Sequence, residues 1–228
     1  MSFFADASKR GWMYTGAILF NKLVPVWMFR CRRFVIYRLR ISEPGNGKAA
    51  QDDVLDIDVS WSETDEQFES IESLTRFNRA DAVRPVRAVQ AMVHREIQGA
   101  IWLSTELFDE VELGVRVTLA PTQAWLFAAM VNKQMRGQGI YSAILNFITS
   151  ELDSLGFEDV LVAVNPANKP SNHVHKKFAK SYVGHVMAVR CFNWVWCSSS
   201  DGITRKSSFT INKRLHPIEI SVLPAEID

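Results

Sequence analysis

One continuous segment, residues 124–155, constrains the fold of this chain more than any other feature. Its first part, residues 124–131, is an unbroken apolar run (Ala-Trp-Leu-Phe-Ala-Ala-Met-Val) of strand length, which is typical of a strand covered on both faces. A loop with Gly137 and Gly139 follows, and apolar residues then recur at helical spacing up to Gly156, a residue type that favours a helix end. The order predicts a buried strand, a glycine loop and a long amphipathic helix.

Such a loop is suited to binding an anion. Glycine lets the backbone approach a ligand closely, and the amide groups at a helix N-terminus carry about half a positive charge. Pyrophosphate is therefore the natural ligand. The loop lacks the Gly-Lys-Ser/Thr of a P-loop, and it lacks the glycine triplet and downstream acid of a Rossmann fingerprint. The first difference excludes a P-loop, and the second argues against a Rossmann dinucleotide-binding loop.

The strand, loop and helix resemble the coenzyme A signature of the GNAT acetyltransferase superfamily, whose pattern is Arg/Gln-x-x-Gly-x-Gly/Ala. Two registers fit the chain. Gln134, Gly137 and Gly139 match every letter, whereas Arg136, Gly139 and Tyr141 depart from the pattern at the last position. We favour the second register, because it places the strand end and the apolar helix face where the family has them.

A second block supports the resemblance, which covers roughly residues 54–215. A strand at 160–164 leads to Asn168 and Ser171, as in the family's Asn-x-x-Ser/Ala segment, and a helix follows. The usual Gly-Phe after that helix is missing. By resemblance, the loop binds the diphosphate of acetyl-CoA or another acyl-CoA, and the second block contacts the pantetheine arm. The cofactor-binding residues are then Val131, Arg136, Gly137, Gln138, Gly139, Ile140, Tyr141, Asn168 and Ser171.

The chemistry of the family is attack of an amine on a thioester, which needs a base and often an acid, commonly tyrosine. Seven residues after Asn168, where that tyrosine often lies, this chain has His175, and imidazole acts near neutral pH. His175 is our candidate acid, with Tyr182 as the alternative, or no acid at all; a solvated helix histidine is an equally good interpretation. The strand before the loop has no carboxylate, so the base is left open among Glu106, Asp109, Glu110, Glu112 and a water chain.

The remaining pattern predicts an α/β (α+β) fold, with a GNAT-like mixed central sheet that has helices on both faces. Two strands near the middle of this sheet are expected to separate. We divide the chain into a basic, aromatic-rich N-terminal extension and linker at residues 1–52 and a GNAT-like domain at residues 53–228. The last two strands are expected at 183–197 and 203–215, joined by a hairpin turn. Cys191 and Cys197 would then share one strand and face the core, and no disulfide is expected.

The N-terminal extension is strongly basic. Residues 1–41 contain eight Lys and Arg against one Asp, a net charge of +7, so the remainder carries −6. Three roles are open: docking on the body as a strand and helix, forming part of a substrate pocket, or lying on an anionic membrane surface. We favour docking. The apolar stretch 11–20 is about half the length that spans a bilayer.

Together these features predict a cytoplasmic N-acyltransferase that moves acetyl from acetyl-CoA to a primary amine, with a small-molecule acceptor, no metal and no nucleic acid partner. Homodimer formation through exposed terminal strands is left open. Two alternatives remain. One is an enzyme similar to the long-chain N-acyl amino acid synthases, and the other is a non-catalytic module that binds acyl-CoA.

Overall fold

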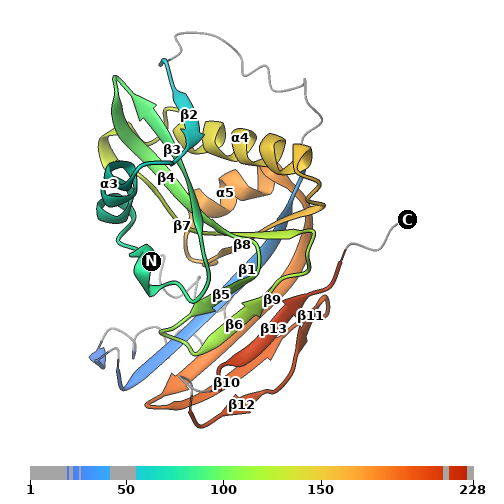
Figure 1. Cartoon of the computed structure of the whole chain (residues 1–228). Coiled ribbons are helices and arrows are strands. Elements are labelled where there is room, and N and C mark those ends of the chain that lie inside the picture. Colours follow the sequence, from blue (N-terminus) through green and yellow to red (C-terminus); the bar gives the residue numbers. More distant parts are fainter. Residues whose placement is uncertain (1–19, 21–22, 26, 42–54, 213–215, 225–228) are drawn as a thin grey trace, which may run out of the picture.

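The computed structural model describes residues 20, 23–25, 27–41, 55–212 and 216–224. Its centre is a mixed sheet of nine strands (Figure 1). Strands β7 and β8 are its parallel pair, and the other pairs are antiparallel. In spatial order the strands are β12 (Phe209–Thr210), β10 (Trp194–Ser199), β9 (Ala179–Cys191), β1 (Phe29–Leu39), β8 (Asp159–Val164), β7 (Gln123–Val131), β4 (Glu96–Ser104), β3 (Arg87–Val93) and β2 (Asp58–Trp61).

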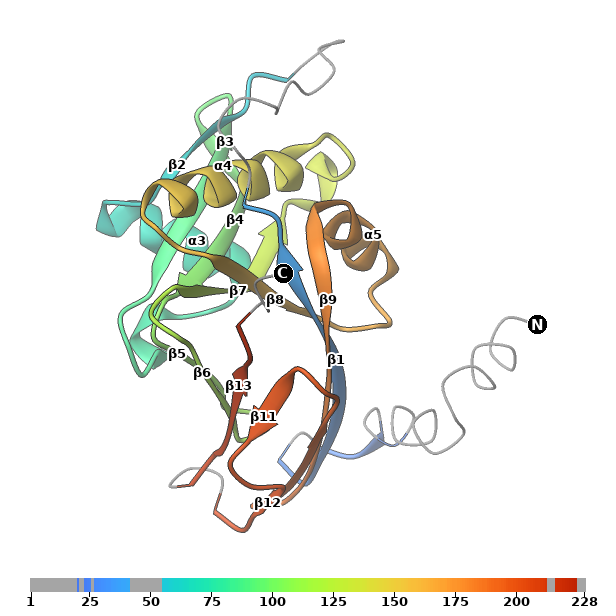
Figure 2. The same ribbon diagram turned by 90° about the vertical axis from the view of Figure 1, so that its right-hand side faces the viewer.

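A second, smaller sheet faces the lower half of the first (Figures 1 and 2). Its strand β13 runs parallel to β6, while the other two pairs are antiparallel. The second sheet therefore joins the C-terminal end of the chain to a hairpin from its middle. Its strands, in spatial order, are β11 (Ile203–Arg205), β13 (Ile218–Val222), β6 (Val115–Thr118) and β5 (Leu107–Glu110).

The helices cover both faces of the large sheet, as the sequence predicts. One hydrophobic core lies under α4 (Ile140–Ser154) and α5 (Lys169–Phe178). The other lies between the large sheet, α3 (Asp65–Thr75) and the second sheet. Residues of β4 alternate between the two cores, since Ile101 belongs to the first and Trp102 to the second. A strand that both cores cover is therefore apolar on both of its faces.

Local signals explain where the helices begin and end. Thr64 and Gln67 form a capping box at the start of α3, with the Thr64 side chain accepting from the Gln67 amide at 3.3 Å. At the far end of α4, Gly156 has a φ of +80°. The expected apolar stripe of this helix is buried, except that Leu155 lies one residue beyond the helix and is exposed.

Strand β1 comes from the segment expected to dock on the body, and it lies inside the large sheet. It pairs with β8 on one side and β9 on the other, over 11 residues. Its burial pattern ends in four buried residues, 36–39. Residues 29–39 of the N-terminal extension thus form a sheet strand, whereas residues 42–52 of the expected extension and linker fall outside the described residues.

Two expectations for the C-terminal strands were wrong. The segment 183–197 is not one strand, because the chain turns at Phe192 and Asn193 between β9 and β10. Cys191 is therefore exposed at the end of β9, while Cys197 is buried in β10. The expected strand 203–215 is also broken, into β11 in the small sheet and β12 in the large one. Phe192 takes a left-handed conformation (φ +53°), which phenylalanine rarely adopts, so the residue type does not predict a turn here.

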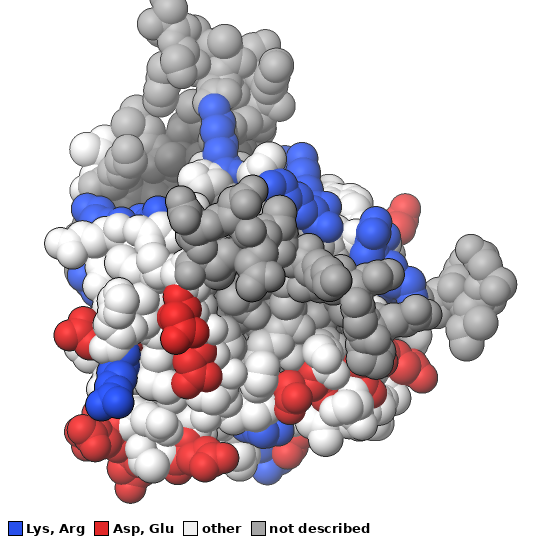
Figure 3. Space-filling model, turned by 90° about the horizontal axis from the view of Figure 1, so that it is seen from above, with Lys and Arg blue, Asp and Glu red and all other residues white. Residues whose placement is uncertain are grey.

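Charge is spread unevenly over the surface. Figure 3 shows the face that is seen from above the view of Figure 1. Most of its described basic side chains lie on one part of this face, and most of the acidic ones lie on another. Among the described helices, none is both long and apolar enough to cross a membrane.

Candidate active site

A surface groove of about 560 Å³ runs along the end of β7, the loop after it and the first turn of α4, with the start of α5 on its far side. Eight of the nine residues expected to bind the cofactor line this groove. The ninth, Gln138, is exposed in the loop and is not part of the lining. The eight are Val131, Arg136, Gly137, Gly139, Ile140, Tyr141, Asn168 and Ser171.

The loop backbone gives the groove its anion-binding character. Gly137 and Gly139 have φ values of +83° and +81°, and a β carbon at either would meet no atom within 4 Å. The conformation, and not lack of space, is therefore what favours glycine there. Gly139 is the N-cap of α4 and no side chain caps the helix, so its first amide groups remain open to a ligand. The Arg136 Nε donates to the Val131 carbonyl at 3.2 Å, which holds the loop against the strand.

A close contact fixes the start of α4 against the sheet. A β carbon added at Gly99 on β4 would lie 2.7 Å from the Ile140 Cγ2 and 3.2 Å from the Ile144 Cδ1. Glycine at this position therefore lets the helix approach the strand. Because Gly99 pairs with Val131, the contact brings the helix N-terminus to the end of β7. The open amides of α4 then face the groove.

The groove continues into a cleft between β7 and β8. The two strands pair only as far as Leu126 with Val162, and beyond that point they part. Ala128 has a φ of +46° and lies where the pairing of β7 with β4 shifts register, which is the mark of a bulge that bends the strand. Residues lining the cleft include Phe127 and Ala163 on the sheet, with Tyr141 and His175 above it.

Tyr141 and His175 form a buried hydrogen-bonded pair in this cleft. The His175 Nδ1 lies 2.8 Å from the Ser171 carbonyl, which can only accept, so Nδ1 carries the proton. In the neutral ring, Nε2 then accepts from the Tyr141 hydroxyl at 2.8 Å. Burial lowers the pKa of His175, although the Ser171 carbonyl partly opposes this shift, and burial raises the pKa of Tyr141. Both side chains are therefore neutral near pH 7.

The two candidate acids lie in different places. His175 lines the cleft, with 2% of its surface exposed, but neither ring nitrogen is left to donate into it. Tyr182 is not part of the cleft lining; it is 57% exposed, on β9, two strands away from β8. The ring of Tyr37 on β1 stacks on His175 instead, with centroids 6.4 Å apart. Sequence reasoning missed Tyr37, because only the sheet pairing brings β1 next to β8.

Three of the four candidate base carboxylates are close to arginines. Asp109 accepts two hydrogen bonds from the same guanidinium group, and the Glu106 pair is exposed on the surface. In the structure, each of these three carboxylates is therefore already engaged by an arginine. The pairs are Glu106 with Arg84 (3.4 Å), Asp109 with Arg116 (2.7 Å) and Glu112 with Arg32 (2.5 Å).

Glu110 is the exception. Its side chain lines a cavity whose other lining residues are apolar, and it also lines the open groove beside that cavity. Its nearest arginine contact is loose, with 3.9 Å between the Arg32 Nη1 and the Glu110 Oε1. Burial raises the pKa of Glu110, an effect that Arg32 only partly offsets. A carboxylate with a raised pKa is suited to accept a proton near neutral pH.

Comparison with known protein families agrees with this geometry. The model of the Acetyltransferase (GNAT) family matches residues 53–179, which is more than half of the chain. The chain belongs to the GNAT acetyltransferase family. The matched range includes the groove, the cleft and Glu110, but β1, all of β9 except Ala179, and the strands from β10 onward lie outside it. A comparison with curated protein sequences gave no match.

Solved structures with a similar fold include other GNAT proteins. A functionally unknown protein from Staphylococcus epidermidis is 11% identical, with a TM-score of 0.47, over 75% of this chain and 66% of its own length, just under two thirds. The ribosomal-protein-alanine N-acetyltransferase of Brucella melitensis biovar Abortus is 14% identical, with a TM-score of 0.40, over 55% and 92%. The ribosomal-protein-S18-alanine N-acetyltransferase of Escherichia coli is 13% identical, with a TM-score of 0.42, over 53% and 75%.

The site fits the co-substrate that the GNAT family typically uses, acetyl-CoA. Open amides at the start of α4 suit a diphosphate, and the cleft between the parted strands suits an extended pantetheine arm. A metal-ligand cluster was not found among the described residues.

Proposed function

We propose that this protein transfers an acyl group, acetyl in the first instance, from acyl-CoA to a primary amine. The observation that carries the proposal is the convergence of eight expected cofactor residues on one groove that leads into the cleft between β7 and β8. Two separate blocks of sequence contribute these residues, which a chance arrangement would not bring together.

In this proposal the donor approaches from the side of α4 and α5. Its diphosphate accepts hydrogen bonds from the loop and the first amides of α4, and its arm passes Asn168 and Ser171. The thioester then lies beside Ala128, where the strands have parted and backbone groups of β7 lack partners on β8. Amide groups there are free to hold the thioester carbonyl.

Glu110 is the proposed base. The acceptor reaches it through the open groove that Glu110 and Phe127 both line, on the opposite side of the sheet from the donor. An ammonium group gives one proton to the carboxylate, and the neutral nitrogen then attacks the thioester carbon. The C–N bond forms and the C–S bond breaks; the second nitrogen proton neutralises the departing thiolate through solvent.

We propose a positioning role for His175 in place of the expected acid. Because Nδ1 donates to Ser171 and Nε2 accepts from Tyr141, the imidazole has no proton facing the cleft. The raised pKa of Tyr141 makes its hydroxyl a poorer acid than a thiol. The pair therefore holds the Tyr141 ring at the cleft wall and does not protonate the leaving group.

Two measurements on the purified protein test the function. Thermal shift with acetyl-CoA, hexadecanoyl-CoA and free coenzyme A ranks the donors, because a ligand that binds only the native state stabilises it. Thiol release with a panel of primary amines then measures transfer. We expect stabilisation by acetyl-CoA and amine-dependent thiol release. Binding without release with any amine favours a sensor module, preference for hexadecanoyl-CoA favours a long-chain enzyme, and no binding of any coenzyme A species overturns the proposal.

A further inference from the structure

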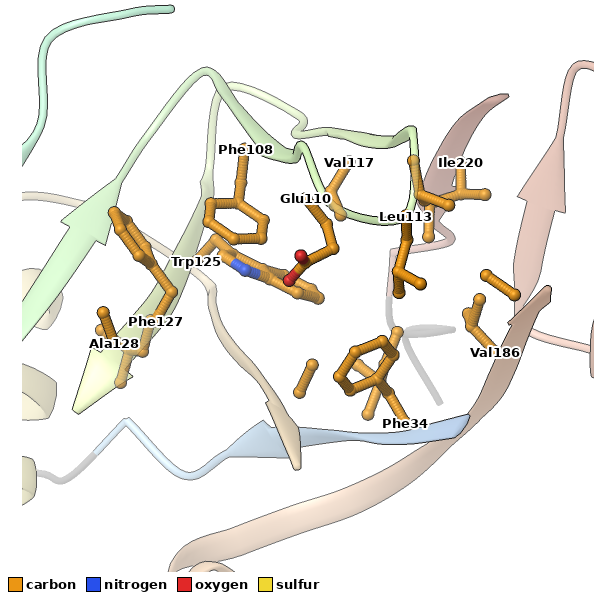
Figure 4. A pocket seen from close by; sticks show the side chains of 15 residues that line it. Phe34, Phe108, Glu110, Leu113, Val117, Trp125, Phe127, Ala128, Val186 and Ile220 are labelled. Carbon is orange, nitrogen blue, oxygen red and sulfur yellow. The ribbon is translucent and has the colours of Figure 1, made fainter. Parts of the chain in front are cut away.

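An apolar cavity of about 170 Å³ lies between the large sheet and the second sheet, on the side opposite α4 and α5. Figure 4 shows Phe34, Phe108 and Trp125 around it, with the Glu110 carboxylate pointing inward. Glu110 is the one polar side chain among the described residues of its lining. An apolar pocket with a single placed charge is the usual form of a site for a small organic ligand.

The cavity has the size of a six-carbon group. A cavity of about 150 Å³ lined by aliphatic and aromatic side chains binds benzene, so this one holds a phenyl ring or a short branched chain. Polar amines such as sugars would leave their hydroxyl groups without partners on these walls, which costs free energy.

Two sets of shared lining residues place the cavity next to the proposed position of the thioester. Phe127, Ala128 and Ala163 line both the cavity and the cleft where the strands part. Glu110 lines both the cavity and the open groove. A hydrocarbon body in the cavity would therefore leave an attached nitrogen between the Glu110 carboxylate and the thioester.

We infer that the acceptor is a primary amine carried on an apolar body of about six carbons, such as a benzyl group. This inference rests on the proposed function. The alternative occupant, an acyl chain of the donor, leaves the partly buried Glu110 carboxylate with only the loose contact to Arg32, whereas an ammonium group pairs with it. The surrounding aromatic faces also attract a cation.

The test compares benzylamine with methylamine, both with acetyl-CoA, in the wild type and in Val186→Phe. Val186 lines the cavity and lies outside the cofactor groove and the cleft, so the larger side chain fills the cavity alone. We expect kcat/KM for benzylamine to exceed that for methylamine by about 100-fold or more, since each buried methylene contributes about tenfold or more. In Val186→Phe this ratio falls to near one while acetyl-CoA binding is unchanged.

Three results separate the possible failures. If methylamine and benzylamine react equally well in the wild type, the inference is wrong and the proposed function stands. If hexanoyl-CoA is preferred over acetyl-CoA and Val186→Phe removes that preference, the cavity holds the acyl chain and the inference is again wrong. Absence of both acetyl-CoA binding and transfer would overturn the proposed function itself. The wild-type comparison decides the matter even if Val186→Phe does not fold.

The opposite end of the large sheet carries a separate feature, a cluster of exposed aromatic and aliphatic side chains that we call the aromatic end. It lies at the turn between β9 and β10 and on β12, at the bottom of Figure 1. Ring pairs hold it together, Trp27 with Phe192 at 6.0 Å and Trp194 with Phe209 at 5.9 Å between centroids. Its exposed members are Trp27, Phe192, Trp194, Trp196, Phe209 and Ile211.

The backbone conformation of β10 and of the turn before it directs these side chains outward. Along β10, Trp194 and Trp196 are exposed while Val195 and Cys197 between and after them are fully buried. Phe192 takes a left-handed conformation at the turn, where a glycine or asparagine is less strained. A bulky residue that accepts this conformation and remains 51% exposed is only half covered within the fold. Its side chain is placed for contact with something outside.

The charge of the same region selects the partner. Residues 185–216, which include β10 to β12, contain five Lys and Arg against one Asp, a net charge of +4, although Arg190 is buried and Lys206 pairs with Glu219. Arg30 and Arg33 lie on the half of β1 that pairs with the last residues of β9, next to the turn. Basic residues near exposed tryptophan and phenylalanine are the combination that binds anionic lipid, because tryptophan prefers the membrane–water interface.

We infer that the aromatic end docks on the surface of an anionic lipid membrane. The aromatic rings enter the interface, and the basic side chains on the adjacent half of β1 contact the headgroups. The donor groove then remains at the far end of the molecule, near α4 and α5 (Figure 1). This inference depends on exposure and charge and is independent of the proposed chemistry.

Sedimentation of the full chain with vesicles tests it. We expect binding to vesicles of phosphatidylcholine with about 30% phosphatidylserine and little binding to phosphatidylcholine alone, with a decrease as salt rises from about 0.1 M to 0.5 M. Trp194→Ser with Phe209→Ser should lower the partition coefficient by about tenfold or more, since burying one such side chain contributes about 1.5–3 kcal/mol. Leu155→Ser removes an equally exposed apolar side chain beyond α4 and is the matched control.

The inference is wrong if the wild type does not bind the anionic vesicles, or if the double variant binds as the wild type does. It is also wrong if the wild type is a dimer that the double variant converts to monomers without any vesicle binding, because the aromatic end is then an interface between two copies. Far-ultraviolet circular dichroism confirms that each variant is folded, and the wild-type vesicle experiment stands without them.

Discussion

The two sides of the large sheet at the gap between β7 and β8 are built in different ways. On the side proposed for the donor, every described residue of the groove comes from positions 129–174, in two blocks that are close in the sequence. On the other side, the cavity takes Phe34 from β1, Glu110 from β5, Val186 from β9 and Ile220 from β13. The donor side is therefore a local motif, whereas the acceptor side exists only when distant segments have packed.

The difference also concerns which atoms do the binding. The donor loop offers backbone amides at positive-φ glycines, so it tolerates many side chains but few changes of conformation. The cavity offers side chains on regular strands, so its size and charge change with single substitutions. In the proposed function, the groove is therefore the less variable site and the cavity the more adaptable one. Four predictions test this contrast, beginning with the largest effect.

Gly139→Val should weaken acetyl-CoA binding by about 100-fold or more, because a branched residue is strained at φ +81° and each lost hydrogen bond to a charged group costs about 1.5–3 kcal/mol. Isothermal calorimetry measures the change. The matched control is Gly156→Val at the other end of α4, which has the same φ (+80°) and equally open space. It should lower the melting temperature to a similar degree and leave the affinity unchanged. Equal loss of affinity in both variants would contradict a backbone site at the loop.

Glu110→Gln should lower kcat/KM by about 100-fold, the usual contribution of a general base, with acetyl-CoA affinity unchanged. In the wild type, kcat/KM should fall as pH decreases through the raised pKa of Glu110, because the protonated carboxyl accepts no proton. This dependence should be absent in the variant. Glu106→Gln, at an exposed carboxylate paired with Arg84, is the control and should change the rate less than about twofold.

Stability gives an independent check on Glu110. A carboxyl whose folded-state pKa is raised favours the folded state while it is protonated, and that contribution is lost as pH rises through the folded-state pKa. Glu110→Gln should therefore melt about 2 °C higher than the wild type at pH 8, and the difference should vanish near pH 4. A lower melting temperature at pH 8 would mean that the contact with Arg32 outweighs burial.

Tyr141→Phe should produce the smallest change, about a tenfold lower kcat, because it leaves the buried His175 Nε2 without its partner and loosens the cleft wall. Steady-state kinetics with saturating substrates measures it. Tyr182→Phe, on the exposed part of β9, should stay within about twofold of the wild type. A larger effect of Tyr182→Phe would restore it as the acid and contradict the proposed neutral pair.

Much of the fold follows from patterns within short stretches. Thr64 and Gln67 mark the start of α3, Gly156 marks the end of α4, and the apolar run before the loop is the central strand β7. Such signals work because hydrogen bonding and side-chain burial over three or four residues already favour one conformation. The same kind of reasoning predicted the C-terminal strands wrongly, because the turn at Phe192 uses a residue that normally avoids a left-handed conformation.

For the site, the sequence alone predicted eight of the residues that line the groove beside α4, since their placement depends on backbone conformation within two short blocks of chain. Tertiary structure alone decided the rest: it singled out Glu110 among four carboxylates, joined Tyr141 to His175 across 34 positions, and placed β1 between β8 and β9. The physical reason is that desolvation and cavity shape depend on which distant segments meet, and no local pattern of residues encodes that meeting.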